Sequence, residues 1–115
     1  MTGLDDVAAL RACADELDTL LARLDADEDA VRADRADATA DDEHDPEGST
    51  LSGEWQRLEA LRRSVRAERA EVAAALARVD AGTYGTCIAC GEPIAPARLE
   101  VRPMATMCVG CASRV

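Results

Sequence analysis

The chain has 115 residues and a formal net charge of -10, with 23 acidic residues against 13 basic ones. Alanine supplies 24 residues, and there is one Trp, one Tyr and no Phe. A large aromatic core is therefore excluded. The chain must fold either as helices that pack through narrow apolar faces or around a bound metal ion. Residues 1–50 hold 16 acids against 4 arginines. Because nucleic-acid affinity comes mainly from cations that neutralise phosphates, direct sequence-specific binding of nucleic acid is not expected.

The sequence predicts neither a membrane span nor a secretory signal. No apolar run approaches the length that a bilayer needs, and residues 1–6 carry acid where a signal would carry base. We therefore expect a cytoplasmic protein, monomeric and without membrane contact.

Two long helices are predicted in the first 80 residues. Residues 2–40 contain no Pro and are rich in Ala, Leu, Arg and acids, all compatible with one helix. A second helix is predicted over residues 53–80, with Ser52 as its cap. The acidic stretch between them, residues 41–50, contains Pro and Gly turn signals. The fold class is thus mostly α.

Both predicted helices repeat apolar residues every seven positions, which is typical of a coiled-coil seam. The repeated residues are Leu10, Leu17, Leu24 and Val31 in the first helix, and Leu58, Val65, Val72 and Val79 in the second. We expect these seams to be supported by Cys13 and Leu20, and by Leu61 and Leu76. If the helices pair antiparallel, Leu24 meets Val65 and Asp27 meets Arg62. Residues 1–80 are therefore predicted to form an antiparallel coiled-coil hairpin with an acidic tip near residues 41–50.

Two CxxC pairs, separated by 17 residues, lie near the end of the chain. A tight turn at each pair presents two sulfurs, and two such turns complete a tetrahedral shell, so this spacing is a strong zinc signal. Gly91 and Gly110 provide the permissive backbone that such turns often need. We predict a C-terminal module, residues 81–115, that holds one structural Zn²⁺ through Cys87, Cys90, Cys108 and Cys111.

Other uses of the cysteines are less compatible with the sequence. A single iron ion is the main alternative, because four thiolates suit it too. A cytoplasmic chain disfavours disulfides, and a thioredoxin-like motif would need a βαβ context. Four protein ligands leave no open metal position. We find no set of nucleophile, base and orienting residue, so no enzyme activity is expected.

The remaining cysteine, Cys13, is predicted to be a small buried hydrophobic residue. Tyr84 is predicted to pack between the module and the hairpin.

The C-terminal motif resembles that of the DksA/TraR family of C4 zinc-finger transcription regulators, which bind bacterial RNA polymerase. Beside the cysteines, the resemblance is carried by Gly82, Tyr84, Gly85, Gly91, Ile94, Arg98, Leu99, Glu100, Arg102 and Pro103. It covers residues 53–111 well, and the first helix only by architecture. The resemblance implies a regulator that acts on the polymerase and does not read promoter DNA.

In this family the hairpin is thought to enter the polymerase secondary channel, with carboxylates at its tip near the catalytic centre. The resemblance implies that Asp45, which precedes Pro46, is the first tip carboxylate. Gly48 and Thr50 stand where the family has a second Asp and an Ala. The acids that could substitute for that second Asp are Asp41, Asp42, Glu43 and Glu47.

A function of a different class is also compatible with these residues. The chain would then be a zinc-stapled adaptor that binds another protein through its hairpin, or dimerises, with no role at the polymerase. Binding to the polymerase core distinguishes the two.

Overall fold

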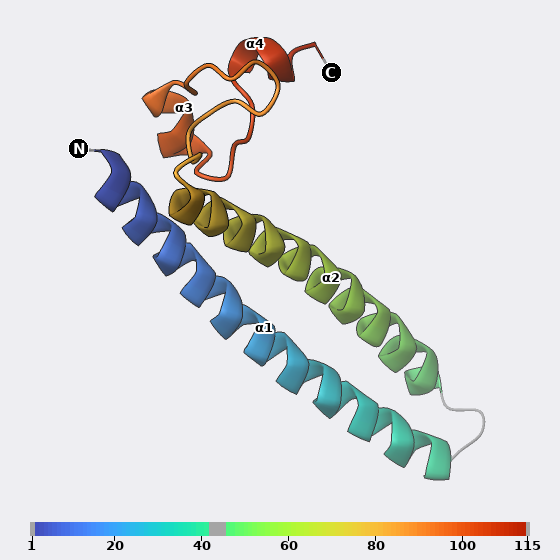
Figure 1. Cartoon of the computed structure of the whole chain (residues 1–115). Helices are drawn as coiled ribbons and strands as arrows, with labels where there is room; N and C mark the ends of the chain where they lie inside the picture. The colour runs from blue at the N-terminus through green and yellow to red at the C-terminus, as the bar shows by residue number, and fades with distance from the viewer. Residues whose placement is uncertain (1, 42–45, 115) are drawn as a thin grey trace. The chain divides into compact units, whose positions relative to one another are not determined.

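The computed structural model describes residues 2–41 and 46–114, and the side-chain surroundings of residues 6–37 and 52–114. These residues form four helices, shown in Figure 1: α1 (Thr2–Asp41), α2 (Pro46–Ala81), α3 (Pro96–Val101) and α4 (Val109–Ala112). Within the described residues there is no β-strand, only an isolated antiparallel bridge between Thr86 and Pro93. None of the described helices has the length and apolar character needed to span a membrane. The expected mostly α fold is confirmed.

The two long helices, α1 with 40 residues and α2 with 36, are built from strong helix formers. The prediction that the second helix begins at residue 53 is wrong, because α2 already begins at Pro46. Proline suits the first position of a helix, where its missing N–H would have no intrahelical partner. Pro46 therefore marks the start of a helix. Ser52, expected as the cap, lies inside α2.

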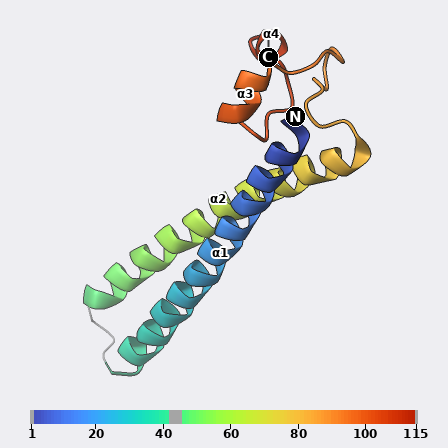
Figure 2. The ribbon, with the colours of Figure 1, turned by 90° about the vertical axis from the view of Figure 1, so that its left-hand side faces the viewer.

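The chain divides into two compact units. The first, here called the hairpin unit, is residues 16–68; in it α1 and α2 run antiparallel, side by side (Figures 1 and 2). The second, the module unit, combines residues 1–15 with residues 69–115, so it contains the start of α1, the end of α2 and the cysteine-bearing segment. A domain boundary between residues 80 and 81 stays a prediction.

The core of the hairpin unit is thin and aliphatic. Leu17, Leu24 and Val31 of α1 are buried, as is Val65 of α2. These residues occupy predicted heptad positions, so the seven-residue repeat does mark the packed face of each helix.

In the middle of the hairpin, the second position of the heptad differs from the prediction by one residue. Glu28 is only 4% exposed, while Asp27 is exposed. On α2, Leu61 is 47% exposed and Arg62 is half-buried. A heptad seam alternates steps of three and four residues, and the seven-residue repeat alone does not say which step comes first. Here the step after Leu24 and after Leu58 is four.

The same displacement corrects the two predictions that depended on it. Cys13, expected to be buried, is half-buried, and Ala14 is buried in its place. The expected pair between Asp27 and Arg62 is also wrong: the carboxylate of Glu28 lies 2.6 Å from Nη1 of Arg62. The pKa of Arg62 is raised above its ordinary value, chiefly by this hydrogen bond with Glu28.

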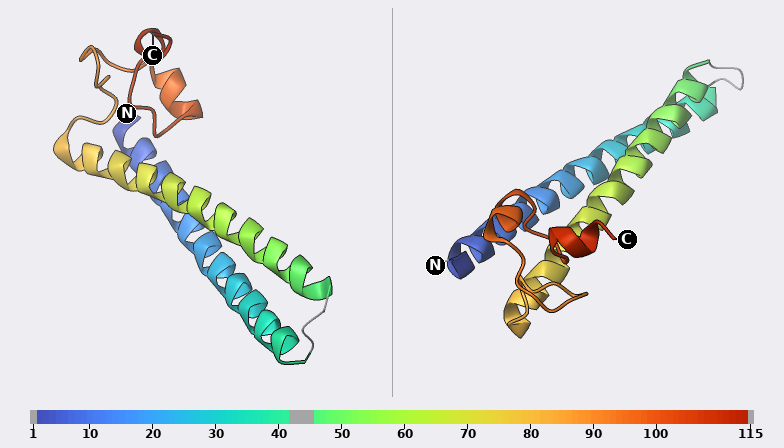
Figure 3. Two further views of the ribbon diagram at one scale, coloured as in Figure 1. Left: turned by 90° about the vertical axis from the view of Figure 1, so that its right-hand side faces the viewer. Right: turned by 90° about the horizontal axis from the view of Figure 1, so that it is seen from above.

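The helices of the module unit pack against each other through alanine and other aliphatic side chains. Leu10 and Ala14 of α1 are buried, and Val72 and Ala75 of α2 are fully buried. The start of α1 crosses the end of α2, as the left view of Figure 3 shows. Alanine at a crossing lets two helix backbones approach closely, because its side chain takes little room.

Candidate metal centre

A glycine ends α2 and starts the cysteine-bearing segment. Gly82 has φ +78°, a conformation that side chains rarely adopt. Its N–H donates to the carbonyl of Val79, and the N–H of Thr83 donates to the carbonyl of Arg78. These two bonds form a Schellman motif, which satisfies carbonyls at the helix end and reverses the chain.

The first CxxC pair lies on a tight turn. The N–H of Gly91 donates to the carbonyl of Cys87 at 3.0 Å, and the N–H of Cys87 donates to the carbonyl of Glu92 at 2.8 Å. Gly91 has φ +77°, so the predicted need for glycine here is confirmed. The turn brings the side chains of Cys87 and Cys90 to one side.

The second CxxC pair lies at the start of the four-residue helix α4. Cys108 caps this helix, and its sulfur accepts a hydrogen bond from the backbone N–H of Cys111 at 3.4 Å. Gly110 lies within α4 and has no positive φ, so the prediction that this turn needs a permissive glycine is wrong. This bond holds Cys108 and Cys111 within one turn, and their sulfurs belong to the same cluster.

The two turns are held together by backbone contacts. The N–H of Ile88 donates to the carbonyl of Thr106 at 2.9 Å. Nε of Arg98, in α3, donates to the carbonyl of Met107 at 2.9 Å. Both acceptors lie just before Cys108, so the second turn is fixed against the first and against α3.

The four sulfur atoms all lie within 4.8 Å of one another. Those of Cys90 and Cys108 are 3.9 Å apart. A tetrahedral ion with Zn–S bonds of about 2.3 Å requires sulfurs about 3.8 Å apart. The four cysteines are thus close enough together to hold one metal ion, as the sequence predicted.

The surroundings of the thiols explain why a cation is needed at this site. Backbone N–H groups of Cys108 and Cys90, directed at the sulfur of Cys87, lower its pKa to about 6. The neighbouring thiols of Cys108, Cys87 and Cys90 raise the pKa of Cys111 to about 12. Four thiolates at such short range repel one another, so a bound cation is required to keep all four ionised. Zn²⁺ supplies this charge and, with four sulfur ligands, has no open position for a reaction.

A small apolar cluster packs next to the four cysteines and includes one of them. Cys87, Ile94 and Leu99 are buried together, and Tyr84 packs against them. The hydroxyl of Tyr84 donates to the carbonyl of Pro103 at 2.8 Å. The pKa of Tyr84 is raised, first by burial and then by the charge of Asp6. Tyr84 therefore packs within the module, with the start of α1 near enough to act on it electrostatically.

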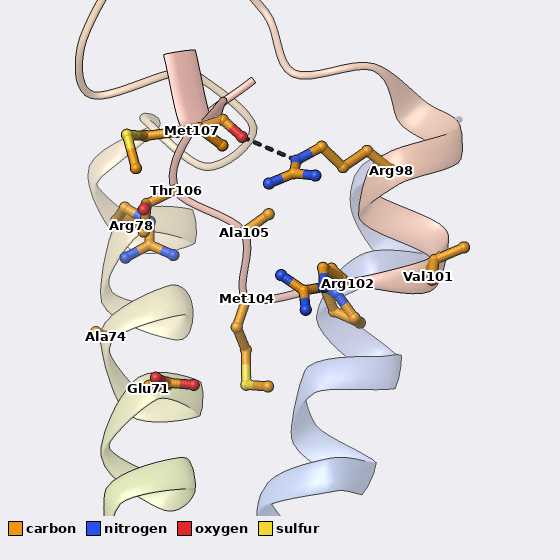
Figure 4. Close-up of a pocket in the computed structure, with 12 residues that line it drawn as sticks. Glu71, Ala74, Arg78, Arg98, Val101, Arg102, Met104, Ala105, Thr106 and Met107 are labelled. Carbon is orange, nitrogen blue, oxygen red and sulfur yellow. Dashed lines mark hydrogen bonds between the residues drawn. The ribbon is translucent and has the colours of Figure 1, made fainter. Parts of the chain in front are cut away.

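A groove of about 630 Å³ lies between α2 and the segment that follows α3 (Figure 4). Three arginines line it, Arg78, Arg98 and Arg102, with one acid, Glu71. Nη2 of Arg78 is buried and has no hydrogen-bond partner among the described residues. The groove is thus locally basic in an acidic chain. The sequence does not reveal this groove, because Arg78 belongs to α2, whereas Arg98 and Arg102 belong to the C-terminal motif.

The acids proposed for the hairpin tip fall mostly where the structure gives no description. Asp42, Glu43 and Asp45 lie outside the described residues. Asp41 is the last residue of α1 and Glu47 the second of α2, and the surroundings of their side chains are not described either. Their role stays a prediction.

Comparison with known proteins gives three kinds of similarity. Residues 82–115 match the model of the prokaryotic dksA/traR C4-type zinc finger. Over 40 residues the chain is 58% identical to the RNA polymerase-binding transcription factor DksA of Caulobacter vibrioides, and over 41 residues it is 42% identical to that of Haemophilus influenzae. These alignments cover 35% and 36% of this chain, and 28% of each relative.

The fold is similar to that of a solved structure, the transcription factor DksA2 from Pseudomonas aeruginosa. The TM-score is 0.59 at 25% sequence identity, covering 93% of this chain and 82% of that one. The curated relatives are thus matched over little more than a quarter of their length, whereas the structural similarity extends to the long helices.

Proposed function

Because the chain belongs to the DksA/TraR family of C4-type zinc fingers, whose module it carries in residues 82–115, we propose that it binds bacterial RNA polymerase and regulates transcription. The observation that carries this proposal is the 58% identity, over 40 residues, to a factor named for polymerase binding. Similarity to a DksA2 structure over 93% of the chain supports the same role for the helices. The chain itself catalyses no reaction in this proposal.

In this proposal the hairpin enters the polymerase secondary channel, and its acidic tip enters first. Residues 1–80 are the hairpin domain and residues 81–115 the zinc module, which anchors the complex. A tip rich in carboxylates competes for cations and basic residues at the magnesium-bearing active centre. The acidic N-terminal half suits a channel of that kind and is repelled by nucleic acid.

The tip acids are tested by replacing them with amides and measuring transcription in vitro. Asp45→Asn is expected to leave polymerase binding nearly unchanged, because most contact area lies along the hairpin and the module, yet to reduce the effect on transcription. Changing all five acids to amides should abolish the effect. The residues changed are Asp41, Asp42, Glu43, Asp45 and Glu47.

A charge-matched control separates the tip from the overall charge. It replaces five other exposed acids by amides: Asp27, Asp34, Glu54, Glu68 and Asp80. This variant should regulate like the parent. If the tip variant also regulates like the parent, or if both variants lose the effect equally, the tip acids have no specific role.

A further inference from the structure

One arginine in the hairpin unit is surrounded by three carboxylates. Nε of Arg62 lies 2.7 Å from Asp25, and its Nη1 lies 2.6 Å from Glu28 and 2.9 Å from Glu59. Asp25 and Glu28 belong to α1, whereas Arg62 and Glu59 belong to α2. We call these four residues the Arg62 cluster. It joins the two helices by charge in the middle of an otherwise aliphatic seam.

The cluster is partly withdrawn from water. The side chain of Glu28 is 5% exposed and that of Arg62 is 15% exposed. Glu28 stands between two buried apolar residues, four positions after Leu24 and three before Val31. Removing charges from water is costly, and an apolar pair of similar volume often gives equal or greater stability. Stability alone therefore does not account for a charged pair at this place.

The apolar residues of this hairpin do not determine its register by themselves. Both helices repeat aliphatic side chains every seven residues, so a slip of one heptad again places aliphatic residues against aliphatic residues. A buried polar group at a single seam position is the known means by which coiled coils select one register.

The charges distinguish the two possible slips from the observed pairing of Glu28 with Arg62. A slip of one heptad in one direction places Glu28 opposite Trp55 and Arg62 opposite Leu21, so both buried charges lose their cross-helix partner. A slip in the other direction places Arg62 opposite Arg35, a repulsive pair. Only the observed register gives both Glu28 and Arg62 an oppositely charged partner on the other helix.

We propose that the Arg62 cluster selects the register of the α1–α2 hairpin. Replacing its buried pair by apolar residues removes the penalty on slipping. The first test variant, E28L/R62L, allows the slip that places position 62 opposite Leu21. The second, Arg62→Met, keeps Glu28 charged and favours the opposite slip, in which Glu28 meets Arg69. The inference concerns the chain alone and does not depend on polymerase binding.

The register is measured by the distance between two nitroxide labels. Ala36 of α1 and Ala67 of α2 are exposed, and each is replaced by a ketone-bearing residue that takes the label without using the cysteines. A slip of one heptad displaces the helices by about 10 Å along their axes. E28L/R62L should acquire a second population at a distance longer by up to about 10 Å, and Arg62→Met one shorter by up to about 10 Å. The parent should show one distance.

A control and a stability measurement complete the test. Asp29→Asn removes an exposed ion pair with Arg32 within α1, 3.5 Å in length, leaves the contact of Arg32 with Glu28 in place, and should keep the parental distance. The urea midpoint of E28L/R62L should equal or exceed that of the parent. A single parental distance in both E28L/R62L and Arg62→Met, with helical circular dichroism retained, would overturn the proposal.

Discussion

Elemental analysis should find one zinc ion per chain, and Cys90→Ser should remove it. Cys90 is exposed, so its replacement leaves no cavity and acts through the metal. The apolar core around the site contains three buried residues, Cys87, Ile94 and Leu99. Zinc contributes about 10 to 16 kcal/mol to the folding of comparable zinc-finger peptides. Loss of the ion should therefore unfold the module while the long helices keep most of their circular dichroism signal.

The remaining cysteine provides the matched control for that experiment. Cys13→Ser makes the same chemical change in α1, outside the four-cysteine site, and should retain one zinc per chain. The order of the module is followed by the amide spectrum of residues 82–114. A Cys90→Ser protein without zinc but with the parental module spectrum would show that the module does not need the metal to stay folded.

The second large effect is expected in the hairpin seam. Leu24 is 4% exposed, so Leu24→Ala should lower the free energy of unfolding by about 2 to 5 kcal/mol, from lost burial and the cavity left behind. Leu61 is 47% exposed, so Leu61→Ala should cost at most about 1 kcal/mol. Both values come from urea unfolding followed by circular dichroism. Equal losses in the two variants would contradict the packing described for this seam.

The cysteine site was predictable because its information is local. Two CxxC turns restrict where the sulfurs can point, and zinc chemistry then dictates a tetrahedral set. Gly91, next to such a turn, was also predictable, since its positive φ follows from the turn itself. Gly110 was not, because α4 starts inside the second pair and needs no left-handed residue.

The hairpin was predictable as a pair of helices but not in its packing detail. The repeat of Leu17, Leu24 and Val31 marks the correct face of α1, yet Leu61 points outward where Arg62 turns inward. The spacing favoured Leu61 for the inside of the seam, and burying an arginine is costly in general. The sequence does not reveal that Asp25 and Glu28, more than thirty positions away, surround that arginine.

The most direct test of the proposed function is the binding of the zinc-loaded chain to bacterial RNA polymerase core. A fluorescently labelled chain is titrated with the polymerase, and a known secondary-channel ligand is then added as a competitor. Saturable binding that the competitor abolishes is the predicted result. Absence of binding, or binding that saturating competitor leaves unchanged, would contradict the account; absence of binding would favour an adaptor with another protein partner.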